Sequence, residues 1–185
     1  MGLTLAFVLV SCGTNGKEPE IVTDLAAVMM ETPNGYRLLE ASARSFDLET
    51  YTAEMSEAPE ADRQVLSAAG FDKGRVQIWT PVVGGRGIAV YVFQLGSADG
   101  AAAVLDRFVT DARVLKKAVP LAVEEIDGAR GSSYPNAASG GAAQVHTVMF
   151  TRSSRLYAIV AGYDVLDADP SSLLEFAHRQ ATVAR

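Results

Sequence analysis

The sequence predicts an α+β fold in which helices pack against one antiparallel β-sheet. In two regions after Gly74, residues alternate with a period of two, which is typical of strands. A short turn interrupts each region, so its strands are expected to pair as a hairpin. Each hairpin is followed by a stretch with helical spacing. Hairpins exclude a purely parallel, doubly wound sheet, which leaves an antiparallel sheet covered by helices.

The region before the first hairpin is predicted to form helices joined by turns. Residues 24–30 are apolar enough for a short helix, which Pro33-Asn34-Gly35 ends. Asp47 is expected to cap a second helix, because apolar residues follow it at helical spacing. A third helix opens at Pro59, and Gly70 suits the position just after its end.

The first hairpin is predicted from strands at 76–80 and 88–95, joined by Gly84-Gly85-Arg86-Gly87. The second of these strands is apolar on both faces, so the sheet needs cover on both sides. Ser97 is expected to cap the following helix, which has an apolar stripe. The residues of this stripe are Ala98, Ala101, Leu105, Phe108, Ala112 and Leu115.

A second unit of similar shape is predicted after this helix. An extended segment at 118–126 precedes a loop at 127–141, which is rich in Gly, Ser and Asn. Strands at 142–150 and 156–163 then form the second hairpin. Asp169-Pro170 supplies the cap and the first residue of the last helix. The two hairpin-plus-helix units hint at internal pseudo-symmetry.

The single cysteine, Cys12, ends the run Leu9-Val10-Ser11-Cys12 after an uncharged apolar stretch. A helix this short covers about half of the hydrocarbon core of a bilayer, so it cannot span a membrane. It fits the apolar part of a secretory signal. The run resembles the lipobox of bacterial lipoproteins, although residues 1–11 lack the Lys or Arg with which such signals usually open. The resemblance implies cleavage before Cys12 and lipidation of its thiol. The alternative is a buried apolar strand with an incidental cysteine.

Three segments are expected along the chain. Residues 1–11 form a lipoprotein signal peptide and residues 12–20 a lipidated flexible tether of Gly, Pro and polar residues. Residues 21–185 form a single α+β domain, with an apolar fraction of 49% in the whole chain. With one cysteine, no disulfide forms within the chain, so packing alone must stabilise this domain.

The charge distribution argues against nucleic-acid binding. The net charge is −6, and the 16 Lys and Arg residues are scattered along the sequence. The glycine run at residues 84–87 lacks the Lys and the Ser or Thr of a phosphate-binding loop, so no cofactor is predicted.

The chain resembles small actinobacterial envelope lipoproteins of the LpqN or PsbP-like kind. The features that carry the resemblance are the lipobox, the tether, Gly70-Phe71 entering a strand that holds Trp79, and an Ala-rich helix after a hairpin. The resemblance implies an α/β sandwich with a binding or accessory role in the cell envelope. It brings no catalytic residues.

Few residues indicate catalysis or metal binding. His146 and His178 are the only histidines, and both have ordinary structural interpretations on a strand and a helix. No G-x-S-x-G motif is present. The carboxylates of Asp164, Asp167 and Asp169 suit a hard cation, but the Gly and Glu of a calcium-binding loop are missing. A turn and a helix cap are therefore expected there, and no metal site.

An aromatic group is the candidate binding surface. Trp79 with Tyr91, Phe93 or Tyr157 would enclose an apolar ligand, but the favoured interpretation is that these rings form the core under the helices. The predicted function is a membrane-tethered, non-catalytic binding or accessory domain for an apolar small molecule, a lipid or an envelope protein. The alternative function is that of a small hydrolase using His146 or His178.

Overall fold

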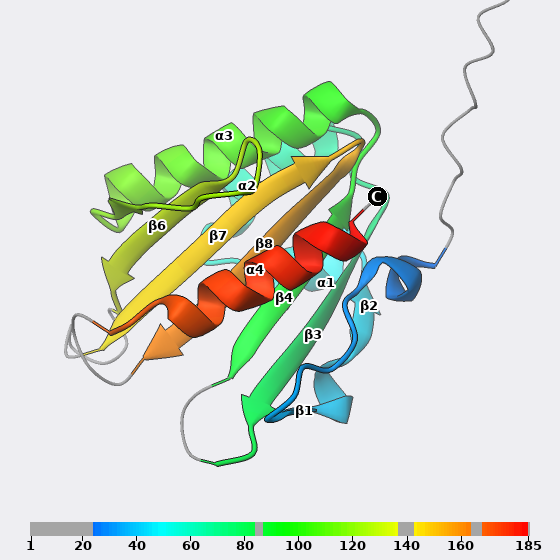
Figure 1. Ribbon diagram of the computed structural model, residues 1–185. Helices are drawn as coiled ribbons and strands as arrows, with labels where there is room; N and C mark the ends of the chain where they lie inside the picture. Colours follow the sequence, from blue (N-terminus) through cyan, green and yellow to red (C-terminus); the bar gives the residue numbers. More distant parts are fainter. Residues whose placement is uncertain (1–23, 84–86, 137–142, 164–167, 185) are drawn as a thin grey trace, which may run out of the picture.

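The computed structural model describes residues 24–83, 87–136, 143–163 and 168–184. It confirms the predicted α+β fold with an eight-stranded antiparallel sheet in the order β1-β3-β4-β8-β7-β6-β5, with β2 also pairing with β3 (Figure 1). The strands are β1 (Tyr36–Leu38), β2 (Arg44–Phe46), β3 (Lys73–Pro81), β4 (Ile88–Gln94), β5 (Val119–Leu121), β6 (Arg130–Pro135), β7 (Gln144–Arg152) and β8 (Arg155–Tyr163). The helical segments are η1 (Leu25–Val28), η2 (Glu40–Ser42), α1 (Leu48–Glu54), α2 (Pro59–Ala68), α3 (Ala98–Leu115) and α4 (Ser171–Val183).

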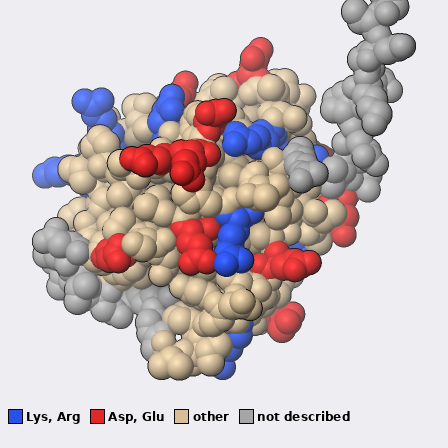
Figure 2. Space-filling model, viewed as in Figure 1, with Lys and Arg blue, Asp and Glu red and all other residues tan. Residues whose placement is uncertain are grey.

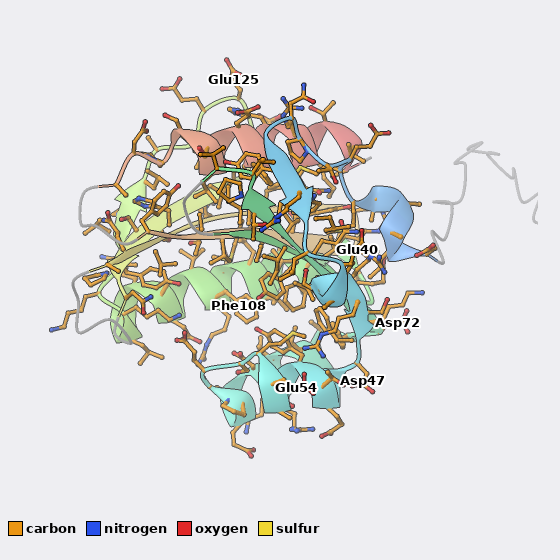
Figure 3. All side chains as sticks on the ribbon, turned by 90° about the horizontal axis from the view of Figure 1, so that it is seen from below. Glu40, Asp47, Glu54, Asp72, Phe108 and Glu125 are labelled. Carbon is orange, nitrogen blue, oxygen red and sulfur yellow. The ribbon has the colours of Figure 1, made fainter. Side chains whose placement is uncertain are left out.

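Helices cover both faces of the sheet, as the doubly apolar strand β4 requires. One face packs against α4 and η1, and the other against α3, with α1 and α2 outermost (Figure 3). Each face has its own core. The core under α4 includes Trp79, Val90, Val92, Phe150, Tyr157, Ile159, Leu173 and Phe176. The core under α3 includes Phe46, Tyr51, Leu66, Val76, Phe93, Val104, Leu105 and Leu156.

The predicted helix caps on this second face are confirmed. The Asp47 carboxylate accepts the Thr50 backbone N–H at 2.8 Å, which starts α1. Ser97 Oγ accepts the Gly100 N–H at 3.0 Å and starts α3. Gly70 follows the end of α2 with a φ of +69°, a left-handed conformation that favours glycine.

The apolar stripe of α3 is only partly as predicted. Ala101, Leu105 and Ala112 are buried, and Phe108 is half-buried. Leu115, in the last turn, is 66% exposed, so the stripe does not continue to the end of the helix. Burial in the middle of the helix is what fixes α3 across β7 and β8.

The prediction that the region before Gly70 is wholly helical was wrong. The short strands β1 and β2 both pair with β3, at opposite ends of it. Strands of three residues are too short to show a period of two, so only their pairing with β3 defines them. The helix predicted at 24–30 is the single 3₁₀ turn η1, capped by Asp24.

The loop predicted at 127–141 contains the strand β6, which is a further correction. β6 pairs with β7 over six residues, and Ser132 and Ser133 within it are buried. Gly and Ser are poor strand formers in isolation, and here the pairing with β7 overrides that preference. The last helix also begins later than predicted. Pro170 occupies the cap position, and Asp169 accepts from the backbone N–H and hydroxyl of Ser171.

The two hairpin-plus-helix units are present, but they are not related by pseudo-symmetry. The strands β4 and β8 are antiparallel neighbours, so a twofold axis relating the two units would run perpendicular to the sheet between them. Such an axis would place α3 and α4 on the same face of the sheet. The helices α3 and α4 lie on opposite faces (Figure 1). The second hairpin therefore does not repeat the first in three dimensions.

Candidate functional site

His146 lies on β7 beneath the start of α4 and is 3% exposed. Its Nε2 donates to the Ala168 carbonyl at 3.0 Å, since a carbonyl can only accept. The buried Nδ1 has no hydrogen-bond partner, and the ring packs edge-on against Tyr163 with centroids 4.9 Å apart. These contacts indicate that His146 stabilises the segment that leads into α4.

Ser133 is the register partner of His146 on the adjacent strand β6. The Ser133 hydroxyl accepts from the Gln144 side-chain Nε2 at 2.6 Å. The side-chain Oε1 of Gln144 in turn accepts the Ala168 backbone N–H at 3.1 Å. In the part of the chain that the structure describes, no hydroxyl is hydrogen-bonded to the His146 imidazole. The pair thus lacks the nucleophile-to-base hydrogen bond of a serine hydrolase.

His178, on α4, is tied to a different loop. Its Nε2 donates to the Glu124 carbonyl at 2.9 Å, in the segment between β5 and β6. The two histidines therefore have separate structural contacts, and no observation favours the hydrolase alternative.

The three aromatic residues of the candidate binding surface are divided between the two faces of the sheet. Trp79 (1% exposed) and Tyr157 (0%) belong to the core under α4, whereas Tyr91 lies on the opposite face with the core under α3. Trp79 Nε1 donates to Thr32 Oγ1 at 3.3 Å, and Tyr157 stacks on Phe150. One ligand cannot contact all three rings in this arrangement. Ligand binding by Trp79, Tyr91 or Tyr157 individually stays a prediction.

Among the described residues, no group of three His, Cys, Asp or Glu side chains is arranged to hold a metal ion. Asp164 and Asp167 lie outside the described residues, as do Cys12 and the tether. None of the described helices has both the length and the apolar character needed to cross a membrane.

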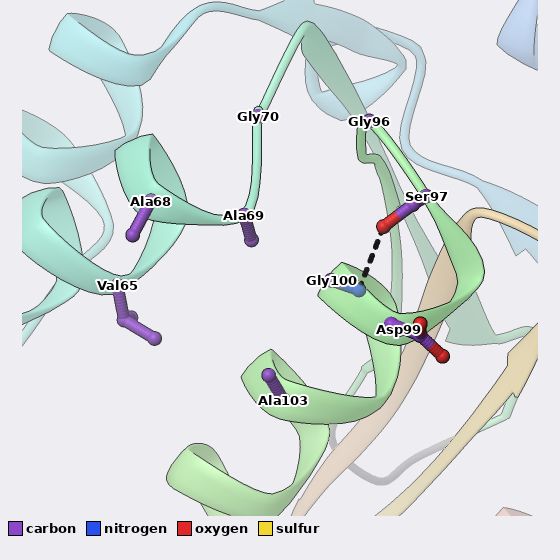
Figure 4. A pocket seen from close by; sticks show the side chains of 9 residues that line it. All are labelled: Val65, Ala68, Ala69, Gly70, Gly96, Ser97, Asp99, Gly100 and Ala103. Atoms are coloured by element: carbon purple, nitrogen blue, oxygen red, sulfur yellow. Dashed lines mark hydrogen bonds between the residues drawn. The ribbon is translucent and has the colours of Figure 1, made fainter.

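A groove of about 510 Å³ lies between the end of α2 and the start of α3 (Figure 4). Its lining is mostly Ala and Gly, and these small residues have a packing role. A Cβ at Gly100 would lie 2.9 Å from the Ala69 carbonyl oxygen, and one at Gly70 would lie 3.2 Å from Gly96 Cα. The groove follows from this close approach of α2 and α3, and no buried polar group points to a ligand in it.

Basic residues gather at one end of the face that α4 covers. Lys73, Gln94, Arg155 and Arg152 stand opposite one another on the four adjacent strands β3, β4, β8 and β7. Arg75 lies in the next row, opposite Val92. Because directly opposed residues share a face, all of these side chains lie on the α4 side. We call Lys73, Arg75, Arg152 and Arg155 the basic end of the sheet.

Hydrogen bonds and ring contacts hold parts of the basic end in place. Arg155 is buried and its Nε donates to Gln94 Oε1 at 3.0 Å. Arg152 donates to the Asp127 carbonyl at 3.2 Å and lies over the Phe150 ring. Lys73 forms a loose ion pair with Asp72, with Nζ and Oδ2 3.9 Å apart.

Three buried polar atoms at this end have no hydrogen-bond partner: Arg75 Nε, Gln77 Oε1 and the Tyr157 hydroxyl. Within the described residues, the Arg75 side chain makes no hydrogen bond or ion pair. Burial raises the pKa of the Tyr157 hydroxyl, although the Arg155 guanidinium, close enough to donate to the hydroxyl oxygen, and the charge of Arg152 partly oppose this rise. Tyr157 is therefore a neutral donor held beside two cations.

No protein-family model matches this chain, and no curated protein matches it in sequence. Among solved structures, the extracellular domain of PknH from Mycobacterium tuberculosis is similar at a TM-score of 0.46 and 13% sequence identity. The alignment covers 83% of this chain and 78% of that one. Any function must therefore be inferred from the residues of this chain.

Sequence reasoning missed the basic end because its members are far apart in the chain. Along the sequence the cations are scattered, and over the face seen in Figure 2 acidic and basic side chains are interspersed. Arg75 and Arg155 are 80 positions apart, and only the register of β3, β4 and β8 brings them to the same end of the sheet. An Arg or Lys at alternate positions next to a strand end, as at 73 and 75, is the one local signal of this arrangement.

Proposed function

We propose that this protein is an extracytoplasmic, lipid-anchored domain with a non-catalytic binding or accessory role at the membrane surface. Residues 1–11 serve as its signal peptide, Cys12 carries the lipid and residues 12–20 form the tether. The observation that carries the proposal is the run Leu9-Val10-Ser11-Cys12, followed at once by a polar, Gly-containing tract.

The first described residues support this arrangement. η1 packs in the core under α4, and the Gln180 side chain holds the segment from Val28 to Met30 through two backbone hydrogen bonds. Whatever precedes Asp24 thus joins the domain at a fixed place on its surface. A lipid at Cys12 would be connected to a rigid body, and two or three acyl chains would make the attachment durable.

The roles of the two histidines support a binding function over a catalytic one. Each donates to a backbone carbonyl of a neighbouring loop, which is a structural contact. The proposed binding function needs neither imidazole as a base.

Lipidation is tested by expressing the full chain and its Cys12→Ala variant in a bacterial host fed a labelled fatty acid. The wild type is expected to incorporate label and to sediment with membranes, and the variant to do neither. Recovery of unlabelled wild type that retains Met1 and a free thiol would contradict the proposal.

A further inference from the structure

We propose that the basic end of the sheet binds the phosphate of an anionic phospholipid headgroup and thereby orients the domain on the membrane. The inference rests on the proposed function for the presence of a nearby bilayer. The site itself rests on the geometry of Arg75, Arg152, Arg155 and Tyr157.

The first argument is the chemistry of the cluster. Three guanidinium groups and one ammonium lie on one face of four adjacent strands. Guanidinium groups present planar pairs of donors that match the oxygens of a phosphate. The net charge of −6 opposes attraction of the whole chain to an anionic surface, so binding there depends on this local concentration of positive charge.

The second argument is that the site contains donors without acceptors. The Tyr157 side chain is fully buried and its hydroxyl proton has no acceptor among the described residues, and Arg75 Nε is likewise buried without an acceptor. Leaving such groups unsatisfied costs free energy, so a ligand that accepts from them gains affinity. A phosphate oxygen accepts from both a hydroxyl and a guanidinium.

The third argument is the position of the site. The basic end, η1 and the C-terminal end of α4 lie on the same side of the molecule (Figure 1). The chain that leads back to Cys12 joins the domain on this side. The 12 residues from Cys12 to Thr23 span at most roughly 40 Å, and a single attachment at Cys12 does not by itself specify which face of the domain meets the bilayer. A second contact on the same side would fix which face meets the bilayer.

The test uses the purified full-length chain with Cys12→Ala, so that its outcome does not depend on lipidation. Binding is measured by flotation with vesicles of phosphatidylcholine alone and of phosphatidylcholine mixed with phosphatidylglycerol. The variants are Arg75→Gln, Arg152→Gln and the double variant. Arg107→Gln is the matched control, because it removes the same charge from α3 on the opposite face.

The expected result is binding to the mixed vesicles that weakens at high salt. Each single variant at the basic end should weaken it about fivefold and the double variant about 25-fold, with Arg107→Gln unchanged. Equal losses in Arg107→Gln, or equal binding of the wild type to phosphatidylcholine alone, would overturn the proposal.

The hydroxyl contact has its own test. Tyr157→Phe removes one buried oxygen and leaves the packing of the ring on Phe150 intact. Wild type is expected to show a rise in Tm with inorganic phosphate that is absent in Tyr157→Phe and in Arg75→Gln, while Arg107→Gln keeps it. A rise that persists in both variants would place phosphate elsewhere. Stabilisation by free phosphate without any vesicle binding would overturn the assignment to a lipid headgroup.

Discussion

The side-chain amide of Gln180 on α4 donates to the Val28 carbonyl at 2.6 Å, across 152 positions of sequence. The same side chain accepts the Met30 backbone N–H at 3.1 Å. Gln180 is fully buried, so both of its polar atoms are satisfied by one backbone segment. This contact holds the first described residues of the domain against its last helix.

Gln180→Leu is expected to lower the free energy of unfolding by about 2–4 kcal/mol, because it leaves a buried N–H and a buried carbonyl without partners. Urea denaturation measures the effect. Arg179→Ala, at the exposed neighbouring position with a surface ion pair to Glu175, is the control and should lose under about 1 kcal/mol. Similar losses in both variants would mean that the two hydrogen bonds are not important for stability.

Gly74→Ala is expected to destabilise the domain by about 1–3 kcal/mol through overpacking. Gly74 is the register partner of Phe46, and a Cβ at position 74 would collide with the Phe46 ring. That ring contacts Tyr51, Phe71 and Phe93, so its displacement disturbs the core under α3.

A double-mutant cycle with Phe46→Ala checks the cause of that loss. In the Phe46→Ala background there is room for the added methyl group, so Gly74→Ala should cost much less there than in the wild type. Additive losses would show that the backbone of β3, and not the ring, resists the substitution.

Phe108→Ala is expected to cost about 2 kcal/mol, below the usual range for a fully buried phenylalanine, since this side chain is half-buried. Phe108 lies on α3 toward the α1–α2 layer (Figure 3) and packs edge-on against Phe93 at 6.0 Å. Leu115→Ala, in the exposed last turn, should change stability by under about 0.5 kcal/mol. Thermal denaturation of the two variants compares them, and a larger loss in Leu115→Ala would contradict the arrangement of this helix.

Asp62→Asn is expected to raise stability at neutral pH. Burial raises the pKa of the Asp62 carboxyl above its ordinary 3.8, and the hydrogen bond from Ser56 offsets this only in part. Because the folded-state pKa is raised, ionisation of Asp62 destabilises the folded state. This loss of stability begins as the pH rises above 3.8 and is complete above the folded-state pKa. The advantage of Asp62→Asn should therefore vanish below pH 3.8.

Asp47→Asn is the control of opposite sign. The hydrogen bond from the Thr50 N–H lowers the pKa of the Asp47 carboxyl in the folded state. The ionised carboxylate therefore stabilises the folded state above its ordinary pKa, and this stabilisation is lost as the pH falls through the folded-state pKa. Asp47→Asn should thus be less stable than wild type at pH 7 and converge with it in acid. Chemical denaturation across this pH range measures both variants, and parallel pH profiles would contradict the assignment.

Local sequence was enough to predict the main helices, the two hairpins and the caps at Asp47 and Ser97. Periodicity and capping act over a few residues, so they can be read directly from the chain. The same reasoning required cover on both faces of β4, which α3 and α4 provide. The lipobox interpretation of Cys12 likewise came from the sequence and stays a prediction.

Tertiary structure decided what depends on pairing between distant segments. β1, β2 and β6 exist as strands only because β3 and β7 offer them hydrogen bonds. The register of the sheet placed Tyr91 on the opposite face from Trp79 and Tyr157, and it brought Arg75 and Arg155 to one end. A shift of one residue in strand register would move these side chains to the other face of the sheet, and no local sequence pattern fixes the register between distant strands.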